Sequence, residues 1–420
     1  MAAHDTPEPR VFLHIGEPKT GTTFLQQVMW SNRAELAAQG VVLPGHHGQD
    51  HFRATQDLRG IQKLPSDPAG SWTGEWEILA RQAAQSAQAG KTAVISHELF
   101  SAADAEQAGR AVASLRPAGV HVVITVRDMG SLLPAEWQET VKHRNARAWE
   151  EWLGDVIDTE SVAEDRRQWW FWRVHDTLAI GRLWSEFVPP ARIHVITMAP
   201  RGAGTSLLWQ RFASLLGIDP GSVDISRARP NASLGLAEIE FLRRLNQALP
   251  AEVPDWFYMW NVKEAVAHTA LADRPAGDRL VLPTDREAWA KDQAEVLIAG
   301  LQNSGYDLIG DLNELRPRQH AIPGASPAGQ PAEQMLDAAV QAAAALVVNQ
   351  YHKEYPAKPD KGGRRGGLAA RIESRVASSP RLKRTVREIS SRSAAARRLR
   401  ILVWQVLERF RTRGRTGGRS

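Results

Sequence analysis

The chain has 420 residues, enough for one large domain or two ordinary ones, with 43% hydrophobic and 24% charged residues, as in a globular protein. It contains no cysteine, which excludes disulfide bonds, thiolate metal ligands and cysteine nucleophiles. The net charge of +5 is unevenly spread. Residues 361–420 hold 18 of the 52 basic but only 3 of the 47 acidic residues, so this tail carries +15 and residues 1–360 carry −10.

The N-terminal residues MAAHDTPEPRVFLHIGEPK lack a long apolar run behind basic residues, so we predict no signal peptide. No stretch reaches the roughly 18 apolar residues that a membrane span requires. The expected location is the cytoplasm, with peripheral attachment to the inner face of the membrane as an alternative.

Apolar runs typical of strands alternate with helical segments along the chain. Four strands are expected, at residues 11–15, 92–96, 120–126 and 192–197. Helices are expected around them, at about residues 22–38, 75–88 and 175–187. This alternation predicts an α/β protein with a parallel, doubly wound sheet, whose ligands bind at the carboxyl ends of the strands.

The rest of the chain predicts three regions of different kind. Residues 228–310 are expected to form a mostly helical insert, and a linker rich in proline and glycine and an alanine-rich helix follow it. The expected organisation is a main domain at residues 1–320, a linker with the alanine-rich helix at residues 321–360, and a basic helical or flexible tail at residues 361–420.

The segment GEPKTGTTF, residues 16–24, directly follows the first expected strand. Gly16 and Gly21 are spaced as in the nucleotide triphosphatase loop G-x-x-x-x-G-K-[ST], but Thr22 stands where the lysine belongs. The lysine is instead Lys19, inside the loop. Backbone N–H groups and the start of the next helix still predict a binding site for an anion.

The strand, loop, displaced lysine and helix together resemble the sulfotransferase family, in particular its bacterial carbohydrate and glycolipid members. The 5′-phosphosulfate loop of that family reads PK[ST]GTT[WF], and here it stands as Pro18-Lys19-Thr20-Gly21-Thr22-Thr23-Phe24. The resemblance implies a P-loop fold and the donor 3′-phosphoadenosine-5′-phosphosulfate (PAPS), bound by Gly16 and by residues 19–24. It also implies that Lys19 neutralises the leaving phosphate, so that no metal is needed.

The 3′-phosphate of this donor requires a second anion site. Arg127 follows the third expected strand, where the resemblance places an arginine that grips the 3′-phosphate. The family's serine partner, about eight residues further on, is replaced here by Ala135. Ser131 is the nearest hydroxyl. The alternative for Arg127 is a salt bridge with Asp128 or Glu136.

Arg229, Asn231 and Ser233 precede another expected helix. Related bacterial sulfotransferases carry a similar R-x-N-x-S segment, which implies a loop that closes over the donor and makes Arg229 a candidate for donor binding. The same residues are equally consistent with an ordinary capped helix.

Transfer to a hydroxyl requires a group that accepts its proton, and His97 and Glu98 follow the second expected strand. Glu98 resembles the S-x-E arrangement of carbohydrate-type members, whereas His97 has the more suitable ordinary pKa. We favour Glu98 and keep both; a structural ion pair with an arginine is the alternative for Glu98. His46, His47 and His51 lie in a glycine-rich loop, where we predict no metal site, and His51 is a reserve base.

For the acceptor of the sulfuryl group, the only indication in the sequence is a group of aromatic residues. Three tryptophans, Trp169, Trp170 and Trp172, stand together in RQWWFWRVHD. Their faces favour a sugar or glycolipid acceptor, although helices also bury tryptophan in their cores. In the tail, residues 397–411 have the composition of an interfacial helix on anionic lipid. A solvated tail without function is an equally open alternative, and nucleic-acid binding is a less favoured one.

The sequence therefore predicts an enzyme that moves the sulfuryl group of PAPS to a hydroxyl of a sugar or glycolipid. Two alternatives stay open. An ATP-dependent small-molecule kinase would require magnesium and a lysine directly after Gly21. A nucleotide-binding adaptor at the membrane surface would act through the basic tail.

Overall fold

The computed structural model describes residues 10–61, 72–162, 166–198, 205–228, 233–272, 274, 277–318 and 326–354. The predictions for Arg229 and for the basic tail lie outside these residues. From Arg10 to Asn349 the described residues belong to one compact unit. No helix within the described ranges is both long and apolar enough to cross a membrane.

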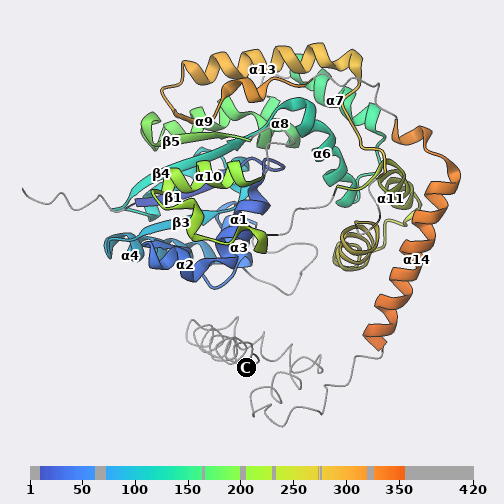
Figure 1. Cartoon of the computed structure of the whole chain (residues 1–420), viewed down its shortest axis with the longest axis horizontal. Helices are drawn as coiled ribbons and strands as arrows, with labels where there is room; N and C mark the ends of the chain where they lie inside the picture. Colours follow the sequence, from blue (N-terminus) through green and yellow to red (C-terminus); the bar gives the residue numbers. More distant parts are fainter. Residues whose placement is uncertain are drawn as a thin grey trace, which may run out of the picture. The chain divides into compact units, whose positions relative to one another are not determined.

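Six parallel strands form one sheet in the order β2-β3-β1-β4-β5-β6. Their bounds are β1 Arg10–Gly16, β2 Val41–Val42, β3 Thr92–Ser96, β4 Gly119–Val126, β5 Ile193–Thr197 and β6 Asp307–Ile309. Figure 1 labels the central strands β3, β1, β4 and β5, which lie side by side in this order. The predicted α/β class with a parallel sheet is confirmed, and the four predicted strands form its centre. The edge strands β2 and β6 were not predicted, because two and three residues carry no readable periodicity.

Helices cover both faces of the sheet, which is why the central strands are apolar on both sides. On β4, Val122 and Ile124 belong to one core cluster and Val123 belongs to the other. The first face packs against α4 Glu75–Gln88, α5 Ala105–Ser114, α9 Thr177–Ser185 and α13 Glu287–Gln302. The second face packs against α1 Thr22–Ser31, α2 Arg33–Ala38 and α10 Thr205–Leu216.

A polar residue separates each of two pairs of consecutive helices: the predicted helix at residues 22–38 is split into α1 and α2, whereas the predicted helix at residues 175–187 corresponds to α9. The buried Asn32 side chain donates to Val28 O at 2.9 Å and Asp224 O at 3.1 Å, so it ends α1 and α2 begins at the next residue. In the same way, Asp176 separates α8 Trp170–His175 from α9, because its carboxylate accepts the Ala179 N–H at 3.1 Å. Both residues satisfy backbone groups that a helix end leaves open.

A third core cluster lies beside the sheet and consists of helices (Figure 1). It joins α8 to α6 Met129–Lys142, α7 Trp149–Val162, α11 Leu236–Ala248, the π-helix η6 Met259–Leu271 and α14 Ala332–Glu354. In addition, α3 Gly48–Leu58 contributes to the core on the first sheet face, and α12 Asp255–Tyr258 contributes to this helical cluster. Short 3₁₀ segments are η1 Glu98–Ala102, η2 Arg166–Gln168, η3 Pro190–Arg192, η4 Pro220–Ser222, η5 Ile225–Arg227, η7 Thr284–Arg286, η8 Leu312–Leu315 and η9 Pro327–Gly329.

Candidate active site at the carboxyl edge of the sheet

The glycine loop joins the carboxyl end of β1 to α1. Gly16 and Gly21 have φ angles of +96° and +88°, in the left-handed region that favours glycine. A Cβ atom on Gly16 would lie 2.8 Å from Glu98 Cα, so the missing side chain lets the loop pack directly on η1. Lys19 has φ +59°, a backbone conformation that residues other than glycine rarely adopt and that often marks a functional site.

The loop presents a row of backbone donors. Within the described residues, the N–H groups of residues 19–24 donate to no other protein group. The bonded positions flank this row: the Glu17 N–H donates to Thr125 O at 2.9 Å, and the Leu25 N–H donates to Gly21 O at 3.1 Å. Gly21 is the N-cap of α1 and offers no side-chain cap. Unpaired N–H groups at a helix N-terminus attract anions.

Thr22, Thr23 and Phe24 form the first turn of α1. Thr22 is buried, Thr23 and Phe24 are half-buried, and the Phe24 ring packs on the core of the second sheet face. Since their N–H groups are the ones left unpaired, we assign the predicted anion-binding role of these residues to the backbone.

A buried hydroxyl network lies beneath the loop. The Thr20 hydroxyl is 2.6 Å from that of Thr125 and 2.5 Å from Glu17 O, so the side chain of Thr20 is used inside the protein. His14 is 2.8 Å from Ser96 Oγ, and burial lowers its pKa to about 4. This histidine is therefore neutral at physiological pH and supports the loop without adding charge.

The Lys19 side chain meets a carboxylate that the sequence analysis did not single out. Lys19 Nζ lies 2.8 Å from Glu139 Oε2 on α6. The same carboxylate is 3.0 Å from Lys263 Nζ on η6, 3.6 Å from Lys142 Nζ and 3.2 Å from His143 Nε2. Three ammonium groups therefore surround one carboxylate, and we call these five residues the Glu139 cluster.

The Glu139 cluster holds an excess of positive charge. Burial alone would raise the pKa of Glu139, but the hydrogen bond with His143 and the charges of the three lysines hold it far below its ordinary range. Burial and the neighbouring charges of Lys19 and Lys263 lower the pKa of Lys142, although Glu139 opposes this. No other carboxylate of the described chain lies within ion-pair distance of Lys142 or Lys263. A poorly solvated excess of cations favours an anionic ligand.

Arg127 and Ser131 lie beside the loop. Arg127 Nη1 donates to Lys19 O at 3.2 Å, so the third predicted strand does bring this arginine to the loop. The Asp128 carboxylate accepts the Ser131 N–H at 2.8 Å and caps α6, whereas Glu136 faces His175. Ser131 thus lies in the first turn of α6, four residues after Arg127.

The structure separates the two candidate bases. His97 Nδ1 accepts the Leu99 N–H at 3.2 Å as the N-cap of η1, which leaves only a protonated Nε2 on the neutral ring. The Glu98 carboxylate accepts one hydrogen bond from Gln26 Nε2, at 3.1 Å. Burial alone would raise the pKa of Glu98, but interaction with His97 and hydrogen bonds from its backbone and Gln26 lower it. The Nδ1 lone pair of neutral His97 is thus occupied, whereas the ionised Glu98 carboxylate retains oxygen lone pairs that can accept a proton.

A second group of charged side chains, around His175, lies under the loop. The sequence did not predict it. The buried His175 ring lies 3.5 Å from Glu17 and 3.6 Å from Glu136, both of which are buried too. Burial by itself would lower the pKa of His175, but the two carboxylates outweigh it and raise the pKa to about 9. An imidazolium thus connects the loop to α6 and α8.

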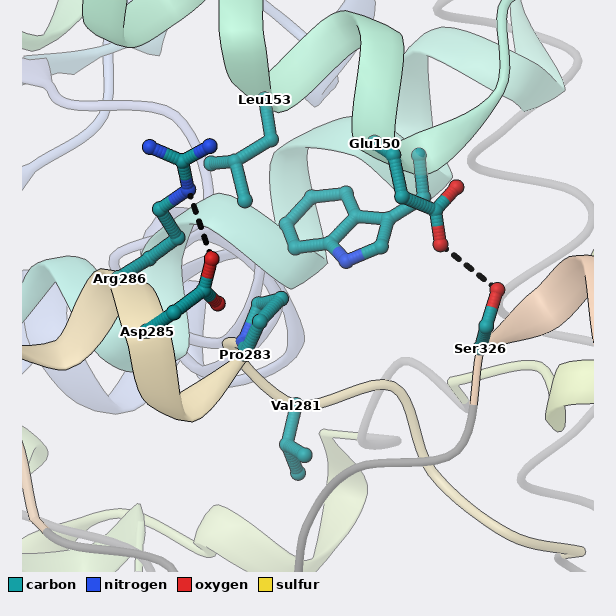
Figure 2. A pocket seen from close by; sticks show the side chains of 8 residues that line it. Glu150, Leu153, Val281, Pro283, Asp285, Arg286 and Ser326 are labelled. Carbon is teal, nitrogen blue, oxygen red and sulfur yellow. Dashed lines mark hydrogen bonds and ion pairs between the residues drawn. The ribbon is translucent and has the colours of Figure 1, made fainter.

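The reserve base His51 and a cavity in the helical region both lie apart from this site. His51 Nε2 donates to Pro44 O at 2.8 Å, and His51 Nδ1 accepts the Ser96 N–H at 3.1 Å. Both ring nitrogens are therefore used inside the protein. No three potential metal-ligating side chains of the described residues are grouped to hold an ion. A cavity of about 280 Å³ lies between α7 and η7, where Glu150 bonds Ser326 and Asp285 pairs with Arg286 (Figure 2).

Comparisons with protein-family models, with curated proteins and with solved structures found no match to this chain.

Proposed function

We propose that the chain is a P-loop sulfotransferase that transfers the sulfuryl group of PAPS to a hydroxyl of a sugar or glycolipid acceptor. One observation carries this proposal: a loop whose six N–H groups find no acceptor among the described residues places its own lysine in a cluster with an excess of cations. A triphosphatase loop would instead project its lysine from the first turn of the helix, where Thr22 stands.

The residues present fit a donor with several anionic groups. The N–H groups of residues 19–24 can surround a 5′-phosphate, and Arg127 lies beside them for a second phosphate. This chain has Ala135 where the family pattern has a serine, one helical turn before Glu139 on α6. Lys142 and Lys263, which pair with Glu139, supply positive charge there. Glu139 would then be the internal counter-ion that holds Lys19 until an anion replaces it.

Each residue has a defined part in the proposed reaction. PAPS supplies the sulfuryl group and a good leaving group, a phosphate. Glu98 accepts the proton of the attacking hydroxyl, and Lys19 with the loop N–H groups stabilises charge on the departing phosphate. Gln26 orients the Glu98 carboxylate, and His97 fixes the start of η1.

Calorimetric titration without added metal tests the proposal against the kinase alternative. We expect adenosine 3′,5′-bisphosphate to bind at least about 10-fold more tightly than ATP, because only the former offers a 3′-phosphate to Arg127. ATP binding that is tighter and requires magnesium would contradict the proposal and favour the kinase.

Replacing each residue in turn tests whether Glu98 or His97 accepts the proton. Glu98→Gln is expected to slow PAPS breakdown, with water as acceptor, by about 10²-fold, while adenosine bisphosphate binding is unchanged. His97→Asn keeps an N-cap acceptor and is expected to retain nearly all activity. Chromatographic detection of released adenosine bisphosphate measures both. A larger loss in His97→Asn than in Glu98→Gln would reverse the assignment.

A further inference from the structure

The surface next to Glu98 is formed by two helices that hold η1 between them. Both α3 and α8 pack against η1. From α3, the Phe52 ring lies 5.3 Å from the His97 ring and 5.5 Å from the Trp72 ring. From α8, Arg173 Nε donates to Ala102 O at 3.0 Å. These contacts place Phe52 beside His97, the residue before Glu98, and Arg173 at the other end of η1.

Two arginines on this surface have no acidic partner among the residues that the structure describes. Arg59 ends α3, two turns after Phe52 and on the same side of the helix, and it donates only to the neutral Gln56, at 2.9 Å. Both Arg59 and Arg173 are half-buried, and no carboxylate of the described residues lies within ion-pair distance of either. Burial and the charge of Arg173 lower the pKa of Arg59 to about 10. Half-buried guanidinium groups of this kind favour a bidentate anionic ligand.

Exposed indole rings stand beside these arginines. The Arg59 guanidinium lies 5.7 Å from the centre of the Trp170 ring. Trp170 is 46% exposed and Trp169 is 54% exposed, whereas Trp172 is buried in the helical core. Of the three clustered tryptophans, two therefore offer a face to a ligand, and such faces stack on sugar rings.

We propose that Arg59, Arg173 and Trp170 form the acceptor subsite and that the acceptor is an acidic sugar. Its ring stacks on Trp170, its carboxylate or sulfate is held by the two arginines, and one hydroxyl reaches Glu98. The proposal rests on the proposed function, because it identifies the acceptor of the same reaction.

Three probes of equal ring size test this subsite by calorimetry on the full chain: methyl β-D-glucoside, methyl β-D-glucuronide and glucose 6-sulfate. We expect one or both acidic probes to bind at least about 10-fold more tightly than the neutral one. A preference for the glucuronide or for the sulfate ester identifies the anionic group. Equal binding of all three, or binding of none, would overturn the proposal.

Matched variants test whether Arg59 causes the preference for the acidic probe. Arg59→Gln is expected to remove the preference for the acidic probe and to leave the neutral probe unaffected. Arg53→Gln, on the same helix but paired with Asp50 at 3.6 Å, is expected to keep the preference. Arg59→Lys keeps the positive charge but lacks the planar guanidinium group that donates two parallel hydrogen bonds. It is expected to show an intermediate preference. A preference that survives in Arg59→Gln would contradict the assignment.

Adenosine bisphosphate binding separates this inference from the proposed function. We expect Arg59→Gln to bind that nucleotide as the unmodified chain does, which also shows that the variant is folded. Loss of acidic-probe preference with intact nucleotide binding supports the subsite. Intact nucleotide binding without any probe preference in the unmodified chain would reject the subsite alone.

Discussion

Replacing Lys19 with methionine is expected to lower PAPS turnover about 10³-fold, while adenosine bisphosphate binding weakens less than 10-fold. Methionine keeps the length of the side chain and removes its ammonium group. The loss falls mainly on turnover because negative charge on the leaving phosphate is greatest in the transition state. The loop N–H groups, which supply much of the ground-state binding, are unchanged.

The matched control for Lys19→Met is Lys91→Met. Lys91 is an exposed lysine that lies just before β3 and outside the Glu139 cluster. Its replacement is expected to change neither turnover nor binding. Equal losses of turnover and binding in Lys19→Met would mean that Lys19 only attracts the nucleotide.

Replacing His175 with glutamine is expected to lower the free energy of unfolding by about 3–5 kcal/mol at pH 7. The reason is that two buried carboxylates, Glu17 and Glu136, would lose the imidazolium between them. Because Glu17 belongs to the glycine loop, the variant is also expected to bind nucleotide more weakly. Urea unfolding followed by circular dichroism measures the stability, and His46→Gln, at an exposed position, is the control.

The stability that His175 contributes has a defined pH dependence. Its pKa is raised from 6.5 to about 9 on folding, so the contribution is complete below pH 6.5 and is lost as pH rises through about 9. The difference in unfolding free energy between the unmodified chain and His175→Gln should therefore shrink from pH 6.5 to pH 9. A difference that grows over this range would contradict a protonated His175.

The central sheet was predictable because its strands are long apolar runs buried on both faces. The edge strands were not, since Val41–Val42 and Asp307–Ile309 are too short for any pattern. The boundary at Asp176 depends on a local N-cap bond from the Ala179 N–H. The break at Asn32 instead depends on two hydrogen bonds between its side chain and the backbone of Asp224, 192 positions further along the chain. Local propensity cannot supply such long-range contacts.

The sequence could predict those parts of the site that directly follow neighbouring strands of the sheet. Lys19 and Arg127 follow neighbouring strands, and the structure does bring them together. Glu139, Lys142 and His143 have the spacing of one helix face, so their proximity was readable, but Lys263 reaches Glu139 from 124 residues further along the chain. His175 likewise lies in a helix that no motif connects to the loop.

A crystal structure with adenosine 3′,5′-bisphosphate tests the central claim most directly. We expect the 5′-phosphate to accept hydrogen bonds from the N–H groups of residues 19–24, with Lys19 Nζ moved from Glu139 to a phosphate oxygen and Arg127 on the 3′-phosphate. A nucleotide bound elsewhere, or a Lys19 ammonium that still pairs with Glu139 in the complex, would contradict the account.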